Sequence, residues 1–217
     1  MKKIMFFFAF SIFSSSLFAQ LDNTRWKATL IIDEPVNVIF DFKKDILSLY
    51  TVADSTMIET MNYTKDDTSF TLTKIDGQSD CDNSTPGKYR FKIKNGKMEV
   101  KMISDGCYDR SSVIDNTTWT KWKEPVEVKV NEAILKQYTG VYELDDAHPI
   151  SVTFEGGRLY AEGPNNGLPK SPLIAESNTK FFLRIAGVEW DFIKDVNGNV
   201  VKLISHEEKD YDLKKIK

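Results

Sequence analysis

The sequence predicts an all-β protein built as two tandem eight-stranded antiparallel barrels that follow a signal peptide. Apolar and polar residues alternate with a period of two over almost the whole chain after residue 20. Turn residues separate these segments at near-regular spacing, and the second half of the chain repeats the pattern of the first. The 217 residues suffice for two small cores, and a hydrophobic content of 41% excludes a disordered chain.

Residues 1–19 have the composition of a secretory signal peptide. Lys2 and Lys3 precede an apolar run, and small residues end this run at Ala19, after which we expect cleavage. The run is short and interrupted by serines, which disfavours a membrane anchor, and no cysteine follows to carry a lipid. We therefore expect a secreted or periplasmic protein without a membrane span after cleavage.

Removal of the signal peptide leaves a mildly acidic protein. It lowers the number of Lys and Arg residues from 29 to 27 against 32 Asp and Glu, so the net charge changes from −3 to −5. Nucleic acids and anionic lipids select basic surfaces, and this chain has no polybasic segment. We expect neither of them to be a partner.

Residues 20–122 contain eight segments of alternating apolar residues, which we expect to form an up-and-down barrel. These segments lie at residues 26–32, 36–42, 47–49, 57–63, 70–72, 89–93, 98–102 and 113–122. The pair Asn95-Gly96 predicts a tight hairpin between the sixth and seventh segments, because both residues tolerate the positive φ that such turns require.

Residues 123–136 are predicted to be a linker that ends in a short helical turn, with Asn131 as its N-cap. The period-two pattern restarts in LKQYTGVYEL, residues 135–144, which we expect to be the first strand of a second barrel over residues 137–217. Tyr138, Gly140 and Tyr142 would share one face of this strand, where the glycine allows bending and close packing.

The two halves of the chain resemble each other in the spacing of their apolar residues. Val38, Phe40, Phe42, Leu47 and Leu49 are spaced like Ile150, Val152, Phe154, Leu159 and Ala161. Both halves also place a late Asn-Gly hairpin after an aromatic strand. We interpret this as two similar barrels in tandem.

Cys81 and Cys107 are predicted to form a disulfide, because an exported chain meets an oxidising compartment. In an up-and-down barrel alternate loops lie at the same end, and counting strands places both cysteines in loops at one end. A redox pair or a pair of metal ligands is the alternative. The absence of Cys-x-x-Cys spacing disfavours both of these functions.

The second half resembles a known domain family in several segments that occur in the same order. These segments are LKQYTGVYEL, ISVTFEGGRLYAE, LIAESNTKFF, EWDFIKDVNGNVVKLISHE and the terminal LKKIK. Over residues 125–217 they resemble the lipocalin-like domain found C-terminal to beta-lactamase-related serine hydrolases. The resemblance implies an eight-stranded lipocalin-like barrel that accompanies a catalytic domain without supplying its nucleophile, and it suggests an exported serine hydrolase as a partner.

Residues 21–122 are similar to small exported lipocalin-like domains. The similarity lies in NTRW, where Trp26 matches the tryptophan-bearing first strand of lipocalins, and in the segments around the two cysteines, GQSDCDNSTPGKYRF and ISDGCYDR. Asn23 and Thr24 stand where the family usually has a glycine before the tryptophan. The resemblance implies a second lipocalin-like barrel, at the N-terminal end of the chain.

The catalytic elements of beta-lactamase-related hydrolases are not expected in this chain. Those enzymes need a Ser-x-x-Lys at the start of a helix, a Tyr-x-Asn element and a Lys-Thr-Gly strand. The stretch Ser177-Asn178-Thr179-Lys180 matches the first motif, but it lies between two predicted strands and no Tyr-x-Asn follows it. Because Ser and Lys are frequent here, we interpret the match as chance.

The other candidate metal-binding and catalytic residues are expected to lie in turns and loops. His148 and His206 are expected in solvated loops rather than in a zinc site. The segment that starts at Asp195 resembles a calcium loop, but its glycine is misplaced and no glutamate ends it, which favours a hairpin turn. The paired carboxylates, such as Asp66-Asp67, also fall in predicted turns. We therefore expect no catalytic residue, metal or cofactor.

The barrel interiors remain as candidate sites. An eight-stranded barrel ordinarily fills its own interior with side chains, and a cavity for a small apolar ligand is the functional alternative. Methionines favour the alternative, since they adapt to varied apolar ligands. The candidate cavity residues are Trp26, Phe40, Met57, Met61, Phe91, Met98 and Met102 in the first barrel, and Tyr142, Phe154 and Trp190 in the second.

Two functional hypotheses follow. The first is an exported, non-enzymatic binding module for a small apolar ligand or an exported protein partner. The second is an accessory or relic domain protein that is associated with a beta-lactamase-related serine hydrolase, and it rests on the family resemblance alone.

Overall fold

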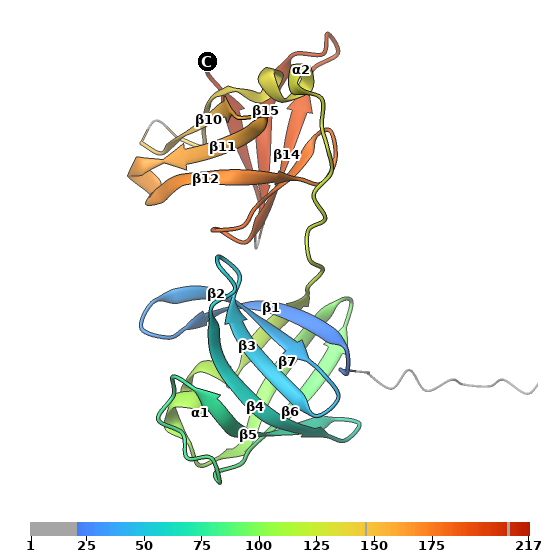
Figure 1. The fold of residues 1–217 in the computed structure, drawn as a ribbon, viewed down its shortest axis with the longest axis vertical. Coiled ribbons are helices and arrows are strands. Elements are labelled where there is room, and N and C mark those ends of the chain that lie inside the picture. Colours follow the sequence, from blue (N-terminus) through green and yellow to red (C-terminus); the bar gives the residue numbers. More distant parts are fainter. Residues whose placement is uncertain (1–20, 146, 208) are drawn as a thin grey trace, which may run out of the picture.

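The computed structural model describes residues 21–145, 147–207 and 209–217, so the predicted signal peptide lies outside the described residues. The chain forms two closed barrels of eight antiparallel strands each, joined by an extended linker (Figure 1). The predicted fold class is confirmed. None of the helices in the described part of the chain is long and apolar enough to cross a membrane.

The first barrel is an up-and-down meander in which each strand pairs with the next and β8 returns to β1. Its strands are β1 (Thr24–Ile31), β2 (Pro35–Phe42), β3 (Ile46–Thr51), β4 (Met57–Lys65), β5 (Ser69–Gly77), β6 (Gly87–Lys94), β7 (Lys97–Asp105) and β8 (Thr117–Lys121). Helix α1 (Tyr108–Ile114) lies between β7 and β8. The loops β1–β2, β3–β4, β5–β6 and β7–β8 therefore lie at one end of the barrel.

Aromatic side chains fill the interior of the first barrel. The rings of Phe40 and Trp119 stack with centroids 3.9 Å apart, and Phe42 packs edge-on against Tyr63. Leu21 is fully buried in the same core. Such aromatic pairs each contribute about 0.5–1.5 kcal/mol beyond the burial of their area. Most of this barrel is thus a packed core rather than a channel.

The second barrel has the same meander, closed by the pairing of β16 with β9. Its strands are β9 (Gly140–Glu143), β10 (Pro149–Glu155), β11 (Arg158–Gly163), β12 (Leu168–Ala175), β13 (Lys180–Leu183), β14 (Val188–Lys194), β15 (Val200–His206) and β16 (Asp210–Lys215). The short helices α2 (Glu132–Leu135) and η1 (Lys136–Tyr138) precede it, and η2 (Pro164–Asn166) follows β11.

Helices α2 and η1 close the end of the second barrel that lies away from the first barrel (Figure 1). Asn131 caps α2 as predicted, since its side chain accepts a hydrogen bond from the Ala133 amide. Tyr138 is fully buried and donates its hydroxyl to the Asn178 carbonyl at 2.7 Å. Gly140 has a φ of +148°, and a Cβ there would lie 2.0 Å from the Lys217 carbonyl oxygen, so the close approach requires glycine.

Two segments predicted as strands are partly helical, which corrects the sequence assignment. The last strand of the first barrel starts at Thr117 rather than Val113, because α1 runs to Ile114. Within LKQYTGVYEL, the residues before Thr139 are helical and only Gly140–Glu143 form a strand. In α1 the buried residues Arg110 and Ile114 are four apart, a helical spacing that the period-two reading overlooked.

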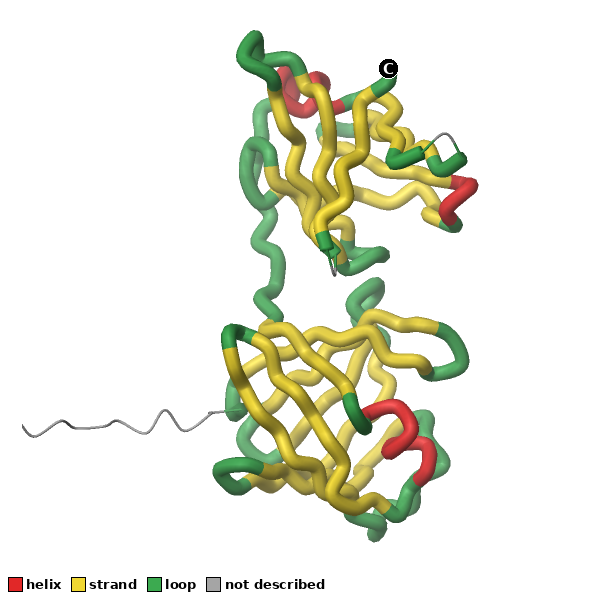
Figure 2. Tube along the Cα trace, turned by 180° about the vertical axis from the view of Figure 1, so that it is seen from behind, coloured by secondary structure: helices red, strands yellow, loops and turns green. Residues whose placement is uncertain are grey.

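The second barrel meets the side wall of the first barrel through the turn between β13 and β14. Asn37 on β2 donates to the Ala186 carbonyl at 2.8 Å, and Lys27 on β1 donates to the Gly187 carbonyl at 2.5 Å. Phe182 packs beside these contacts in an apolar cluster with Ile39. The linker runs along one side of the molecule between the barrels (Figure 2).

The disulfide predicted between Cys81 and Cys107 is confirmed. Their Cα atoms lie 5.4 Å apart, and the bond joins the β5–β6 loop to the residue before α1. Both cysteines are buried. The bond therefore fixes the start of α1 at the end of the barrel where the four loops gather.

Breaking this disulfide should destabilise the first barrel selectively. The double variant Cys81→Ser/Cys107→Ser should lower its free energy of unfolding by about 3–4 kcal/mol, because the 26-residue separation closes a loop in the unfolded chain. Guanidinium unfolding monitored by tryptophan fluorescence measures this change. The second barrel has no cysteine and is the internal control. A loss below about 1 kcal/mol, or an equal loss in both barrels, contradicts the prediction.

Candidate ligand-binding site

Each barrel has a cavity at one end of its strands. The first has a volume of about 500 Å³ and the second about 660 Å³. Both volumes lie within the range of small-molecule sites, roughly 300–1,000 Å³. In the second barrel the cavity is opposite the end that α2 and η1 close.

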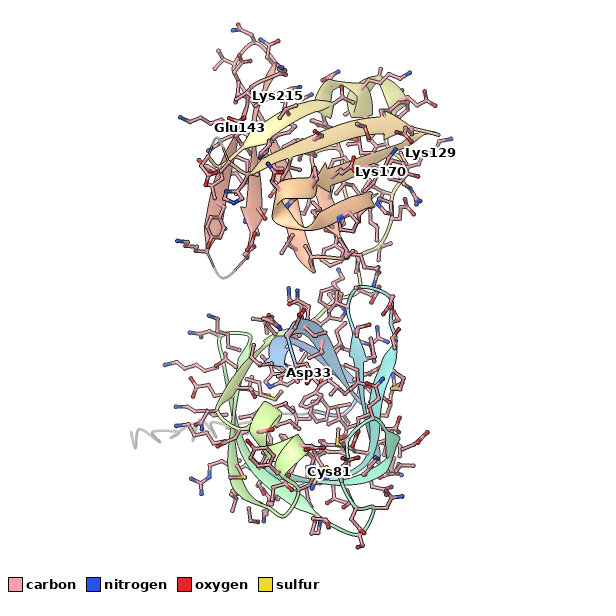
Figure 3. All side chains as sticks on the ribbon, turned by 90° about the vertical axis from the view of Figure 1, so that its left-hand side faces the viewer. Asp33, Cys81, Lys129, Glu143, Lys170 and Lys215 are labelled. Carbon is pink, nitrogen blue, oxygen red and sulfur yellow. A yellow bond between two sulfur atoms is a disulfide. The ribbon has the colours of Figure 1, made fainter. Side chains whose placement is uncertain are left out.

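The first cavity lies between the loop ends of β1, β3 and β4 and the inner face of α1. Its apolar wall is formed by Ile31, Leu49, Ile58, Met61, Val113 and Ile114. Its polar residues come from β4, from α1 and from the β1–β2 and β5–β6 loops, and Asp33, Glu59, Asp109 and Arg110 are the charged ones. Figure 3 labels Asp33 and Cys81, which belong to the β1–β2 and β5–β6 loops at this end of the first barrel.

A buried ion pair holds α1 against this end of the barrel. Arg110 donates from Nε and Nη2 to the two oxygens of Asp105, at 2.7 Å each, and from Nη2 to the Thr85 carbonyl at 2.9 Å. The exposed fractions of the Arg110 and Asp105 side chains are 2% and 0%. A bidentate pair of this kind fixes both distance and orientation. Together with the disulfide it gives α1 two tethers.

The hydrogen bonds around Asp105 determine its charge state. Burial alone would raise the pKa of Asp105, but hydrogen bonds from Arg110, from the Tyr89 hydroxyl and from the Cys107 amide outweigh it and lower the pKa. Burial raises the pKa of Tyr89, and its hydrogen bond to Asp105 adds to this effect. Asp105 is therefore the anion that balances the charge of Arg110.

Glu59 is the second charged group in the cavity wall that is buried, with an exposed fraction of 5%. Its carboxylate accepts hydrogen bonds from the Ser79 hydroxyl at 2.7 Å and from the Ser79 amide at 3.2 Å. On β4 the buried residues Glu59, Met61 and Tyr63 alternate with more exposed ones, so strand phase directs the carboxylate inward.

The second cavity is mostly apolar and carries a chain of hydrogen bonds. Its wall includes Leu183, Val188 and Leu213. The indole of Trp190 donates to the Ser205 hydroxyl at 3.0 Å, and this hydroxyl donates to Glu207 at 3.0 Å. The chain satisfies the buried polar atoms of Trp190 and Ser205 within the protein, so they do not require a ligand.

The structure brings only part of the predicted cavity residues to a cavity wall. Met61 lines the first cavity and Trp190 the second. Five others are buried in the packed cores instead: Trp26, Phe40, Phe91, Met98 and Tyr142. Phe154 is half-buried on β10, with the Lys136 ammonium group 5.0 Å from its ring centroid.

Met57 and Met102 do not face the interior, which corrects their assignment to the cavity. Their exposed fractions are 49% and 41%. Both lie next to a register shift, between β3 and β4 for Met57 and between β6 and β7 for Met102. A β-bulge inserts one residue and changes the direction in which the following side chains point, so simple alternation, which would direct Met57 and Met102 into the barrel, fails at these ends.

The other motifs lie in turns and surface networks. Ser177 is in the β12–β13 turn, where its hydroxyl oxygen accepts hydrogen bonds from the Thr179 and Lys180 amides at 3.2 and 3.0 Å. Lys180 pairs with Glu189 at 3.1 Å. Asp195 accepts from two amides within its hairpin turn, as the turn assignment predicts.

The two histidines each lie beside carboxylates. The Nδ1 atom of His148 is 2.7 Å from Asp145 Oδ1. His206 lies between Asp191 and Asp210 at 3.0 and 2.8 Å. Burial lowers the pKa of His206, but the hydrogen bonds to both aspartates outweigh it and raise the pKa. Within the described ranges, no group of three or more His, Cys, Asp or Glu residues is arranged to hold a metal ion.

Sequence reasoning missed the two buried charged residues of the first cavity. Glu59 lies in the same strand phase as Met61, so its inward position could have been found from β4 alone. Arg110 lies four residues before Ile114, the spacing of a helix that the period-two reading did not consider. Its partner Asp105 gives no such signal, because only the closed barrel brings the two together.

Comparison with known proteins supports the resemblance for the second half of the chain. Residues 124–217 match the model of a domain of unknown function, DUF3471, which is often found at the C-terminus of beta-lactamase-related proteins. This range covers the linker from Glu124 and the whole second barrel. No curated protein matches the chain.

Substituting Asp105 should change both the stability of the first barrel and its dependence on pH. Asp105→Asn leaves the charge of Arg110 buried without its anion, which should cost about 3–5 kcal/mol at pH 7. A carboxyl group with a lowered pKa stabilises the folded state above its unfolded pKa of about 3.9 and loses this contribution as the pH falls through its folded pKa. The difference in unfolding free energy between the two proteins should therefore shrink below about pH 4.

Urea unfolding between pH 7 and pH 2.5 measures this difference. Asp212→Asn is the matched control, because Asp212 forms an exposed ion pair with Lys202 and should contribute at most about 1 kcal/mol. If Asp105→Asn is no more destabilising than this control, or if its effect is the same at every pH, the Arg110–Asp105 pair does not hold α1 in place.

Proposed function

We propose that the protein is an exported binding protein whose first barrel takes up a small ligand with an apolar body. The observation that carries the proposal is the cavity of about 500 Å³ at the loop end of the first barrel, covered on one side by the doubly tethered helix α1. A concave, mostly preformed site with an apolar wall and few polar groups is the usual form of a small-molecule site.

The contrast between the packed core of the first barrel and its accessible apolar residues at the cavity supports a binding site. Below the cavity the aromatic core is closely packed, with Phe40 stacked on Trp119. At the cavity, by contrast, apolar residues remain accessible, and Ile31 has an exposed fraction of 63%. A ligand that covers such residues removes apolar area from water, which favours binding by about 25 cal/mol per Å² before the costs of association.

Export and the lack of an enzymatic role are parts of the same proposal. The disulfide is typical of proteins that function in an oxidising compartment. Ser177, the residue that matched a nucleophile motif, uses its hydroxyl oxygen to accept hydrogen bonds within a turn, and no described residue forms a hydrogen bond with it that would act as its base. We therefore assign the protein a role in binding.

A second candidate function is association with an exported beta-lactamase-related serine hydrolase. The observation that favours it is the match of residues 124–217 to a domain often found at the C-terminus of such proteins. Co-purification with affinity-tagged protein from the native host tests it. Recovery of a serine hydrolase at a fixed stoichiometry supports the association, and its absence under mild conditions counts against it.

Blocking the first cavity should abolish ligand uptake. N-phenyl-1-naphthylamine is a neutral apolar probe that fluoresces when it leaves water, and we expect it to bind the wild-type chain saturably at one site in the first barrel. In Val113→Trp the larger side chain on α1 would occupy the cavity and weaken probe binding by about tenfold or more, which equals about 1.4 kcal/mol.

Two controls make this titration specific. Val201→Trp adds the same bulk on a 41% exposed position of the second barrel and should leave probe binding unchanged. Val188→Trp fills the second cavity and should also leave it unchanged. If Val188→Trp rather than Val113→Trp abolishes binding, the second barrel is the site, and if the wild-type chain does not bind the probe, the ligand proposal fails.

A further inference from the structure

Glu59 is a buried carboxylate that has no cationic partner among the described residues. Its only hydrogen-bond donors there are the hydroxyl and the amide of Ser79, both uncharged. The described residues form 16 ion pairs, and Glu59 takes part in none of them. Acidic side chains that are this deeply buried are ordinarily paired with a cation.

The cavity cannot supply that cation from its own wall. Among the described residues that line it, Arg110 is the only basic one, and Asp105 already balances its charge. The remaining charged groups at the wall are the carboxylates of Asp33, Glu59 and Asp109. Asp33 and Asp109 are exposed at the rim, where their negative potential would attract a cation toward the buried Glu59.

One polar atom of Arg110, a residue that lines the same cavity, has no hydrogen-bond partner among the described residues. The Nη1 group of Arg110 is buried and makes no hydrogen bond to any described residue. Since Nε and Nη2 are both used on the edge that faces Asp105, Nη1 points away from that edge. An unsatisfied buried donor costs about as much as a lost hydrogen bond, so an occupant that offers an oxygen atom here would stabilise the site.

We infer that the ligand of the first cavity is a small organic cation, an amine with an apolar body, whose ammonium group pairs with Glu59. This inference rests on the proposed binding function and specifies its ligand class. The apolar body lies against Ile58, Met61 and Val113, and an oxygen atom on the ligand accepts a hydrogen bond from Arg110 Nη1. An anionic ligand is disfavoured, because it would meet three carboxylates and an arginine that is already neutralised.

A matched series of probes tests the charge of the ligand. 1-Naphthylmethylamine, 1-naphthylmethanol and 1-naphthoic acid share one apolar body and differ in being cationic, neutral and anionic at pH 7. Isothermal titration of the mature, disulfide-bonded chain should show the amine binding at least about tenfold more tightly than the alcohol. The acid should bind more weakly than the alcohol, and the preference for the amine should decrease with added salt.

Two glutamate variants test whether Glu59 causes the preference for the amine. Glu59→Gln keeps the shape of the side chain and removes its charge, so the amine should bind no more tightly than the alcohol, while alcohol binding is unchanged. Glu99→Gln is the matched control on the exposed face of β7 and should keep the wild-type selectivity. The wild-type series is decisive by itself if Glu59→Gln does not fold.

The outcomes separate the inference from the proposed function. Equal binding of the three probes, or tightest binding of the acid, overturns the cationic ligand but leaves a binding function in place. Loss of selectivity in Glu99→Gln as well would show that the preference is not due to Glu59 and also overturns the inference. If neither these probes nor the neutral probe N-phenyl-1-naphthylamine binds, the proposed function fails together with the inference.

Discussion

The ion pair between Arg110 and Asp105 determines the form of the open end of the first barrel. Besides this pair, α1 is held by the disulfide before its start, by a hydrogen bond from the Asp80 amide to Asp109 and by the packing of Ile114, but the pair is its only buried ionic contact among the described residues. A buried pair contributes little net stability compared with apolar side chains of similar size, but its geometry is specific. Here that geometry places a helix over the barrel mouth without letting it fill the interior.

The same ion pair sets the electrostatic character of the cavity. Because Asp105 neutralises Arg110, the wall keeps the negative charge of Glu59 and of the two rim aspartates. The closely packed aromatic residues beneath the cavity supply the stability of the barrel, so the mouth is free to carry groups that a core would exclude. The aromatic core therefore stabilises the barrel, and the residues at its mouth are available to bind a ligand.

The two barrels share a topology but use their ends differently. In the second barrel the linker enters through α2 and η1, which close one end, and the opposite end faces the side wall of the first barrel. Its hydrogen-bond chain from Trp190 to Glu207 is satisfied internally. In the first barrel, by contrast, Glu59 is buried and no described residue supplies it with a cation, and this difference makes the first cavity the better candidate site.

The sequence predicted the parts of the structure that follow from local periodicity. Alternation identified both barrels, strand counting paired Cys81 with Cys107, and Asn131 marked the start of α2. Bulges beside Met57 and Met102 could not be predicted, because one inserted residue changes the face of a strand without changing its composition. The pair of Arg110 with Asp105 depends on closure of the barrel, which alternation alone does not describe.

The most direct test of a cation-binding first barrel is a crystal structure of the disulfide-bonded protein with 1-naphthylmethylamine. We expect the ammonium nitrogen at hydrogen-bond distance from the Glu59 carboxylate, roughly 2.7–3.2 Å, with the naphthalene ring between α1 and the ends of β3 and β4. A ligand seated in the second cavity, or α1 packed into the first cavity so that Ile114 and Met61 leave no room, would contradict it.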